Sequence, residues 1–524
     1  MTGKILFKKL EFLLTPILIS IFPILSFYES NIEELSLAFL NKPLTYAVAV
    51  SVVLTLVLIR LVRDKQKSAL IISIFIFIFF SYGHLSNFLN DKLFIELPNG
   101  IVLGPDKVLL PIVFVGFIYF VYKILKSKSD FTKILNLTNL ILIFLIAFLL
   151  INIYLNQIQR VDSASQVPEN NSKSINTEDA PDIYHIILDG YAREDVLKEI
   201  YDYDNSEFTK SLRDLGFYVA DNARANYIHT YISLPSTFNM TYLDSLTEQF
   251  GENPASGRTA RDMMINNEVT QILKENGYKT INFATWWDGT ADSYPADITY
   301  NNDTSYSVAG VNIAISQSNV IFLQTTILSP LIKEVWGDAL RGKILYTLQN
   351  LPDVPYMDGK KYTLAHIITP HPPYIFNEDG SIVEGSEFET ADEGVDKRDK
   401  YLSQLKFISK QITPVLKGII ENSEEEPIII LQSDHGPASI FGKREDWQAN
   451  YSNDALNERT GVLYAIYLPD QDYEDLYSDI TPVNTYRIIL NKYFGTDYEL
   501  LPDKTYYTDY DAIYKFEDVT EEIK

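Results

Sequence analysis

The chain contains no cysteine among its 524 residues. Disulfide bonds, thiolate metal ligands and thiol nucleophiles are therefore excluded. Histidine is scarce, with six residues in the whole chain, so any imidazole chemistry must come from a small set. Basic residues are outnumbered as well, with 44 Lys and Arg against 69 Asp and Glu and a formal net charge of −25. Because anionic polymers bind basic surfaces, we expect no nucleic-acid partner.

Long apolar runs, in contrast, are concentrated in the first 154 residues. Each of five runs is about long enough to cross a bilayer as a helix, which takes roughly 17–25 residues. We therefore predict a transmembrane domain of about five helices over residues 1–154. The predicted spans are Leu10–Tyr28, Leu44–Val62, Ala69–Phe88, Val108–Leu125 and Leu137–Tyr154.

The positions of the basic residues predict the orientation of these spans. Lysines and arginines precede the first span and fill the loops between spans two and three and between spans four and five, as at Lys8, Arg63 and Lys126. Loops of this kind stay in the cytoplasm. With an odd number of spans, everything after Tyr154 lies outside the cytoplasm. We expect a multi-pass protein of the bacterial cytoplasmic membrane with its catalytic domain outside.

The rest of the chain alternates between strand-like and helix-like segments. Residues 155–181 are polar and predict a flexible linker, and residues 182–524 are long enough for one layered α/β domain with helices on both faces of a sheet. The expected strands begin at Ile183 and continue with Lys279–Ala284, Tyr362–Ile368, Ile428–Gln432 and Val462–Leu468. The expected helices are Glu207–Leu215, Ser236–Thr247, Glu268–Asn276, Val395–Ile420 and Val483–Tyr493.

Two of these strands end on acidic residues. The run from Ile183 to Leu188 is followed by Asp189, and the run from Ile428 to Gln432 is followed by Ser433 and then by Asp434 and His435. In parallel sheets, ligands collect outside the carboxyl ends of the strands. We therefore expect two carboxylates and an imidazole to converge at one edge of the sheet, where they offer a site to a divalent metal.

A segment crowded with hydroxyl groups precedes one expected helix. Residues 225–239 carry several Thr and Ser side chains just before and within the start of that helix. A helix N-terminus favours bound anions, and a Thr or Ser held there beside a metal can ionise and attack phosphorus or sulfur. The alternative is that these residues serve only as helix caps and turn residues.

Two histidines lie five residues apart at the exit of another expected strand. His366 is within the strand, and His371 opens a His-Pro-Pro-Tyr turn. Imidazoles in this place can bind a second metal, hold a phosphoryl oxygen or protonate a leaving group. His366 could equally be a structural residue, hydrogen-bonded within the strand.

Taken in order, these motifs resemble the alkaline-phosphatase superfamily in its sulfatase-like branch. The likeness is greatest to membrane-anchored lipoteichoic acid synthases and lipid A phosphoethanolamine transferases. Those families end the first strand of the outer domain on Glu or Asp, which matches Asp189, and their Asp-His-Gly matches Asp434 and His435. Their nucleophilic threonine lies three residues before a Ser-x-Pro in the transferases, and Thr230 has that spacing to Ser233.

The resemblance also implies roles for these residues and for the two histidines. It implies a divalent metal ion (Mn, Zn, Mg or Ca) held by Asp189, Thr230, Asp434 and His435. His371 and His366 match substrate-binding histidines of the family, and His371 would act in catalysis beside Thr230. The chain departs from the transferases by having Asp189 where Glu is usual, by lacking disulfides and by having Pro437 after the Asp-His-Gly.

The resulting functional hypothesis is a membrane-anchored, metal-dependent phosphotransferase. It would move a phospho-head group from a membrane lipid donor, through a phosphothreonine intermediate, to a glycan, polymer or lipid acceptor of the cell envelope. One alternative keeps the fold but makes the enzyme a hydrolase, either a phosphodiesterase or a sulfatase. In the sulfatase case Ser233 would be the alternative nucleophile, after conversion to formylglycine. Another alternative is a catalytically silent, membrane-anchored binding protein.

Overall fold

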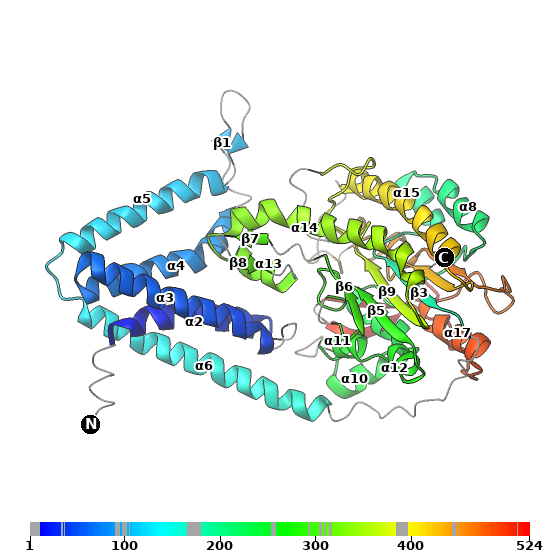
Figure 1. Cartoon of the computed structure of the whole chain (residues 1–524), viewed down its shortest axis with the longest axis horizontal. Coiled ribbons are helices and arrows are strands. Elements are labelled where there is room, and N and C mark those ends of the chain that lie inside the picture. Colours follow the sequence, from blue (N-terminus) through cyan, green and yellow to red (C-terminus); the bar gives the residue numbers. More distant parts are fainter. Residues whose placement is uncertain are drawn as a thin grey trace. The chain divides into compact units, whose positions relative to one another are not determined.

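The computed structural model describes residues 11–523 except for 33–34, 36, 90–94, 97–101, 104, 165–179, 253–257, 292–293, 303–305, 309–310, 314–316, 384–396, 443–446, 449 and 511. The chain divides into two compact units (Figure 1). The first unit comprises Met1–Glu169 and Ser318–Glu334, and the second comprises Asn170–Gln317 and Val335–Lys524. Most of the expected linker, residues 165–179, lies outside the described residues.

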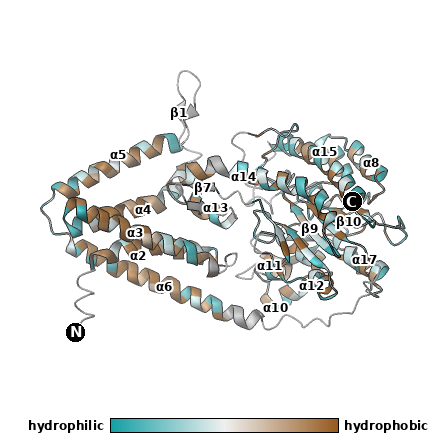
Figure 2. Ribbon diagram, in the orientation of Figure 1, coloured by the Kyte–Doolittle hydropathy of each residue, from teal (hydrophilic) through white to brown (hydrophobic). Residues whose placement is uncertain are grey.

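The first unit contains five helices that are long and apolar enough to cross a membrane, as the sequence predicts. They are α2 (Leu14–Ser30, preceded by the short η1, Glu11–Leu13), α3 (Asn41–Val62), α4 (Lys65–Leu89), α5 (Pro105–Lys126) and α6 (Thr132–Ala164). Apolar residues predominate along all of them (Figure 2). Large side chains on α5 and α6 such as Phe114 and Phe144 are exposed, which suits surfaces that face lipid.

A short piece of the chain from much later in the sequence also belongs to the first unit. It contains α13 (Gln317–Gln324) except for its first residue, and the beginning of α14 (Ser329–Asn350). Phe322 of α13 is buried in one cluster with Ile24 of α2 and with Ile76 and Phe80 of α4. Hydropathy along the chain does not distinguish this segment from the domain that surrounds it.

The second unit is built on a seven-stranded sheet with the order β4-β11-β10-β3-β9-β5-β6. The strands from β10 to β6 run parallel, whereas β11 is antiparallel to both of its neighbours. Every residue of β3, β9 and β10 is buried, as expected for parallel strands covered on both faces. The strands are β3 (Ile183–Leu188), β4 (Tyr218–Val219), β5 (Lys279–Phe283), β6 (Ile298–Tyr300), β9 (Lys361–Ile367), β10 (Ile428–Gln432) and β11 (Tyr464–Tyr467).

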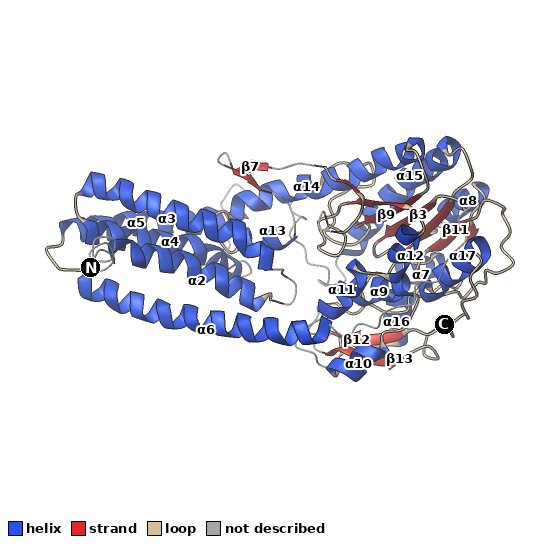
Figure 3. Ribbon diagram, turned by 60° about the horizontal axis from the view of Figure 1, so that its bottom comes forward, coloured by secondary structure: helices blue, strands red, loops and turns tan. Residues whose placement is uncertain are grey.

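Helices cover both faces of this sheet (Figures 1 and 3). On one face, Ile187, Leu364 and Ile430 of the sheet form a core with Phe238 of α9 and Leu273 of α12. Helix α15 lies on the side of the sheet opposite to α12 and α17 (Figure 1). The helices of this unit are α7 (Glu194–Tyr201), α8 (Ser206–Asp214), α9 (Thr230–Asn239), α10 (Asp244–Phe250), α11 (Arg258–Ile265), α12 (Glu268–Glu275), α15 (Arg398–Asn422), α16 (Asn453–Thr460) and α17 (Thr485–Phe494).

The predicted fold class is confirmed, but one predicted helix is wrong. The segment Ser236–Thr247 is two helices, α9 and α10, instead of one. Met240 adopts a left-handed backbone conformation with φ 52°, and Thr241 N donates to Ser236 O at 3.2 Å. This is a common way to close a helix C-terminus, so α9 ends at Asn239. Its start at Thr230 is what matters for the site.

Candidate active site

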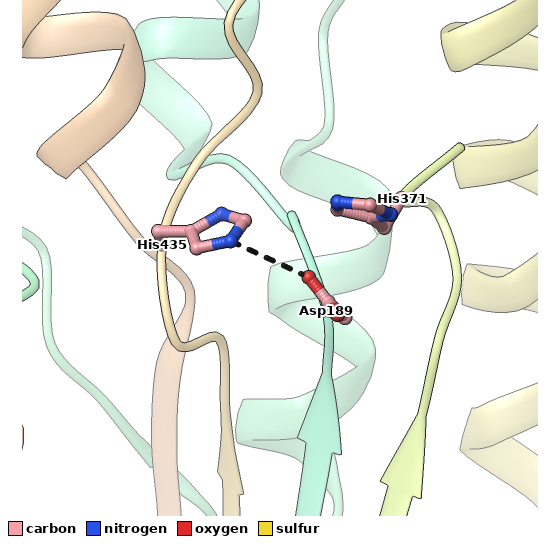
Figure 4. A group of neighbouring side chains, drawn as sticks. All are labelled: Asp189, His371 and His435. Carbon is pink, nitrogen blue, oxygen red and sulfur yellow. Dashed lines mark ion pairs between the residues drawn. The ribbon is translucent and has the colours of Figure 1, made fainter. Parts of the chain in front are cut away.

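The topology of the sheet brings the strand-end residues together. Asp189 follows β3, Asp434 and His435 follow β10, and β3 and β10 are parallel neighbours. On the other side of β3, His366 is near the end of β9 and His371 lies in the loop after it. Figure 4 shows Asp189, His371 and His435 pointing toward one another from three loops at this edge of the sheet.

The two carboxylates surround one imidazole nitrogen. His435 Nε2 is 3.7 Å from Asp189 Oδ1 and 3.5 Å from Asp434 Oδ2. His435 Nδ1 is 3.0 Å from the carbonyl oxygen of Gly436, so Nδ1 carries the proton and Nε2 presents its lone pair. A nitrogen lone pair and two carboxylates that face one another are arranged as ligands are around a bound cation.

The burial and charge of this site also fit a cation. Asp189 Oδ1 and both carboxylate oxygens of Asp434 are buried, and none has a hydrogen-bond partner among the described residues. Burial, together with the charge of Asp189, raises the pKa of Asp434 well above its ordinary value. Burial works against ionisation of Asp189 too, but His371, His366 and His435 hold the pKa of Asp189 below its ordinary value. Two buried acids this close cannot both ionise without positive charge between them. Carboxylate and imidazole donors suit Zn, Mn, Mg or Ca to different degrees.

Thr230 lies against this site at the first residue of α9. The preceding residue, His229, is extended, so the helix begins abruptly at Thr230. Thr230 Oγ1 is 3.0 Å from His435 Nε2, and the threonine is half-buried whereas the acids are buried. The hydroxyl group therefore points at the carboxylate pair from the positive end of a helix, where negative charge on the oxygen is favoured.

Ser233 occupies a different place one turn further along α9. Its side chain is fully buried, and its hydroxyl donates to the backbone carbonyl of Asp434 at 2.8 Å. This hydrogen bond fixes α9 against the loop that carries Asp434. The structure thus gives Ser233 a supporting contact and gives Thr230 the position beside the acids.

His366 is engaged by protein groups on both sides of its ring. Its Nε2 is 3.2 Å from Asp189 Oδ2, and its Nδ1 is 3.1 Å from the hydroxyl oxygen of Thr290. The ring is buried and makes a T-shaped contact with the ring of Trp287. Nε2–H therefore donates to the carboxylate and orients it, a common arrangement next to metal ligands.

His371 is half-buried and has one nitrogen directed away from its own loop. Its Nδ1 donates to the carbonyl of Pro372 at 2.6 Å, which leaves the lone pair on Nε2. Each of Asp189, His371 and His435 offers a ligand atom within 4.8 Å of the others. The close approach of this loop to β3 depends on Gly190, since a side chain there would be 3.4 Å from His371 and the glycine has φ +76°.

Gln404 of α15 holds the loop around His371. It is fully buried, and its amide nitrogen donates to the carbonyls of Pro370, His371 and Pro373 at 3.2, 3.0 and 3.4 Å. Its amide oxygen accepts from the backbone of Ile375 and Phe376. A glutamine in an amphipathic helix gives no signal of this role in the sequence.

Arg459 is a second supporting residue that sequence reasoning missed. Its buried guanidinium donates from Nε to Ile228 O and from Nη1 to Gly436 O, both at 2.7 Å. Ile228 lies just before Thr230, and Gly436 follows His435. Arg459 therefore ties the segment that leads into Thr230 to the loop that carries Asp434 and His435, and its positive charge adds to burial in lowering the pKa of His435.

Gly436 is required by close packing. A β-carbon at Gly436 would lie 2.1 Å from the backbone oxygen of Glu458. Gly436 is not among the residues with positive φ, so no special backbone conformation requires a glycine there. The constraint is the contact with the end of α16.

Comparisons with known proteins found one family model and several similar solved structures. Residues 181–474 match the family model described as Sulfatase, and no curated protein matches the chain. Similar solved structures include lipooligosaccharide phosphoethanolamine transferase A (EptA) from Neisseria meningitidis, at 14% identity and a TM-score of 0.37 over 92% of this chain and 94% of that chain. The C-terminal periplasmic domain of EcEptC from Escherichia coli, in complex with Zn, has 14% identity and a TM-score of 0.41 over 62% of this chain and 86% of that chain. The 2-O GAG sulfatase BT1596 has 12% identity and a TM-score of 0.34 over 63% of this chain and 73% of that chain.

The packing of Gly436 generates a first prediction. Gly436→Ala should push the ligand loop away from α16, because overpacking against backbone costs about 1–3 kcal/mol. We expect a metal dissociation constant about tenfold higher, since 1.4 kcal/mol is a factor of ten. Calorimetric titration of the purified full-length protein with Mn or Zn measures this. Gly116→Ala is the control, because a β-carbon there meets nothing within 4 Å; equal affinity in both variants would contradict the argument.

A second prediction distinguishes the role of Arg459 in positioning the loop of Asp434 and His435 from its contribution to the stability of the fold. Arg193 is the matched control, because it is also 5% exposed and also donates to a backbone carbonyl, that of Ala223. Arg459→Met and Arg193→Met should both lower the melting temperature, since each loses charged hydrogen bonds worth about 1.5–3 kcal/mol apiece. Only Arg459→Met should also weaken metal binding, and Arg459→Lys should restore it in part. A similar loss of metal affinity in Arg193→Met would remove the special role of Arg459.

Proposed function

This chain belongs to the sulfatase family, and we propose that it is a membrane-anchored, metal-dependent phosphotransferase that works through Thr230. The family model matches more than half of the chain. Five apolar helices precede the matched part, and they would keep an active site near a lipid substrate. The basic loops between these helices support an orientation with the catalytic domain outside the cytoplasm.

The observation that carries the proposal is the place of the Thr230 hydroxyl group. It begins α9, lies 3.0 Å from His435 Nε2 and is reachable from solvent, while the two acids behind it are buried. An alcohol becomes a strong nucleophile only where its ionised form is stabilised. A divalent cation held by Asp189, Asp434, His435 and Thr230 would supply positive charge for that ionised oxygen and for the phosphoryl oxygens.

The reaction then has two half-reactions that balance. In the first, Thr230 Oγ forms a bond to the phosphorus of a lipid phosphodiester, and the bond from phosphorus to the lipid alcohol breaks. The threonine proton ends on that alcohol, and His371 is the group placed to carry it, because its Nε2 lone pair faces the site. In the second, an acceptor hydroxyl or amine attacks the phosphothreonine, the Thr230 oxygen leaves and it regains a proton from the acceptor.

We assign the remaining histidine and serine to support. Both ring nitrogens of His366 are hydrogen-bonded, one to Asp189 and the other to Thr290. His366 therefore orients the carboxylate of Asp189 and does not contact the substrate. Ser233 has its hydroxyl committed to the Asp434 carbonyl. The sulfatase alternative requires Ser233 to be oxidised and to act as the nucleophile, so this buried contact favours the phosphotransferase.

The Thr230 assignment predicts a covalent intermediate. The full-length protein, incubated with metal and with phosphatidylethanolamine or phosphatidylglycerol, should gain the mass of the matching phospho-head group. The adduct should persist in Ser233→Ala and in Thr230→Ser, and it should be absent from Thr230→Ala. Intact-mass spectrometry followed by peptide mapping measures both the adduct and any aldehyde at Ser233. Unchanged phosphodiester turnover in Thr230→Ala, or an aldehyde at Ser233, would sink the proposal.

Mutation should distinguish the roles of His435 and His371. His435→Ala should lose both metal and activity, because it removes a ligand. His371→Ala should keep its metal and lose about 10²–10⁴ in turnover, as expected for a proton-transfer group. Plasma emission on the purified variants gives the metal content. A metal-free His371→Ala protein would instead make His371 a ligand, which its closeness to Asp189 and His435 would allow.

A further inference from the structure

The segment Ser318–Glu334, which we call the returning segment, belongs to the membrane-helix unit although the residues on both sides of it belong to the catalytic unit. The chain therefore passes between the two units three times, near residues 170, 318 and 335. From Ser318 to Ile332 the segment contains no charged residue, in a protein whose charged fraction is 22%. An uncharged run of this length is too short to span a bilayer and is typical of buried or re-entrant segments.

The side chains of the returning segment pack among the apolar helices. Phe322 is 8% exposed, and its ring lies 5.1 Å from that of Phe27, 6.0 Å from that of Phe39 and 6.1 Å from that of Phe80. Such a cluster of rings is stabilised by dispersion and by edge-to-face contacts. The segment is therefore held by α2 and α4 through specific packing.

Backbone hydrogen bonds join the segment to α4 as well. Gly83 N donates to Thr325 O at 3.0 Å, and Ile327 N donates to Phe79 O at 2.8 Å. In a helix, the amide of Gly83 and the carbonyl of Phe79, four residues earlier, are the two partners of one hydrogen bond. The returning segment therefore contacts both groups of that pair, the amide through Thr325 and the carbonyl through Ile327. Only glycine permits this approach, because a β-carbon at Gly83 would lie 2.0 Å from Gln324 O.

The turn between α13 and α14 has its amide groups satisfied. Thr325 N, Thr326 N and Ser329 N donate to nearby carbonyls, and Leu328 N donates to the Thr326 hydroxyl oxygen. The hydroxyls of Thr325 and Thr326 donate to Phe322 O and Leu323 O. Non-helical backbone can exist at membrane depth only when its polar groups are paired in this way.

The depth of the contact follows from the length of α4. Gly83 is 18 residues after Lys65, the first residue of α4, which corresponds to about 27 Å along the helix. The hydrocarbon core is about 30 Å thick. If Lys65 is at the cytoplasmic boundary, as its basic neighbours predict, Gly83 is near the opposite boundary of the hydrocarbon.

We propose that the returning segment is a re-entrant, lipid-contacting element, which enters the outer leaflet and presents Ile321 and Leu331 to acyl chains. These two large apolar residues are 39% and 49% exposed, whereas Phe322 between them is buried against α2 and α4. Exposed apolar residues on an uncharged turn whose backbone amides are paired fit a lipid surface. The element fastens the catalytic chain to the bilayer at a place distinct from the linker, and the inference does not depend on the reaction.

The absence of cysteine makes a direct test available. Single cysteines introduced as Ile321→Cys and Leu331→Cys in the full-length protein carry a nitroxide label after reconstitution into vesicles of phosphatidylethanolamine and phosphatidylglycerol. Phe144→Cys on α6 is the lipid-facing reference at 68% exposure, and Leu500→Cys in the catalytic unit is the water-facing reference at 41% exposure. The measurement is the ratio of collision rates with oxygen and with a polar nickel chelate.

The result expected is a ratio at both labelled positions closer to that of Phe144→Cys than to that of Leu500→Cys. Ratios closer to that of Leu500→Cys would overturn the proposal. Adding Gly83→Val to Ile321→Cys should shift the ratio toward water, because the bulkier residue excludes Gln324, while Gly116→Val should leave it unchanged. No shift with Gly83→Val would show that the segment does not dock on α4 as proposed.

Discussion

The structure of the catalytic unit depends on two buried carboxylates at the ends of adjacent parallel strands. Asp189 and Asp434 are 3% and 0% exposed, and together they surround the unprotonated nitrogen of His435. Without a positive charge, desolvation and mutual repulsion would destabilise this arrangement by several kcal/mol. Binding of a cation would offset this local destabilisation. The neighbouring residues described above keep the two acids in place.

Those parts come from segments far apart in the sequence. Arg459 joins the carbonyls of Ile228 and Gly436, and Gln404 collects the carbonyls around His371. Both residues donate hydrogen bonds to backbone carbonyls, so they fix the course of the loops whatever side chains the loops carry. Thr230 and His371 are only half-buried, so they are the groups of the site that a substrate can reach.

Much of the site was predictable because strand ends in a parallel sheet converge. The acid after β3 and the Asp-His pair after β10 could be placed together from the strand patterns alone. Thr230 and His371 needed the resemblance to a family, because a hydroxyl-rich turn and a histidine pair have common structural uses. Arg459 and Gln404 could not be predicted, since their contacts join residues that are tens to hundreds apart and involve carbonyls that any residue could offer. The returning segment was missed because an eight-residue helix is too short to be recognised by hydropathy, and its partner is a glycine within another helix.

Thermal unfolding of wild type and Asp434→Asn, with chelator and with saturating metal, tests the central claim most directly. Asn keeps the shape of the side chain and removes one of the two charges. In chelator the variant should melt at a higher temperature than wild type, because the repulsion is relieved. In metal at about 100 times the dissociation constant, wild type should gain about 2.7 kcal/mol, and the variant should gain much less. Equal melting temperatures in chelator, together with equal gains in metal, would contradict the account.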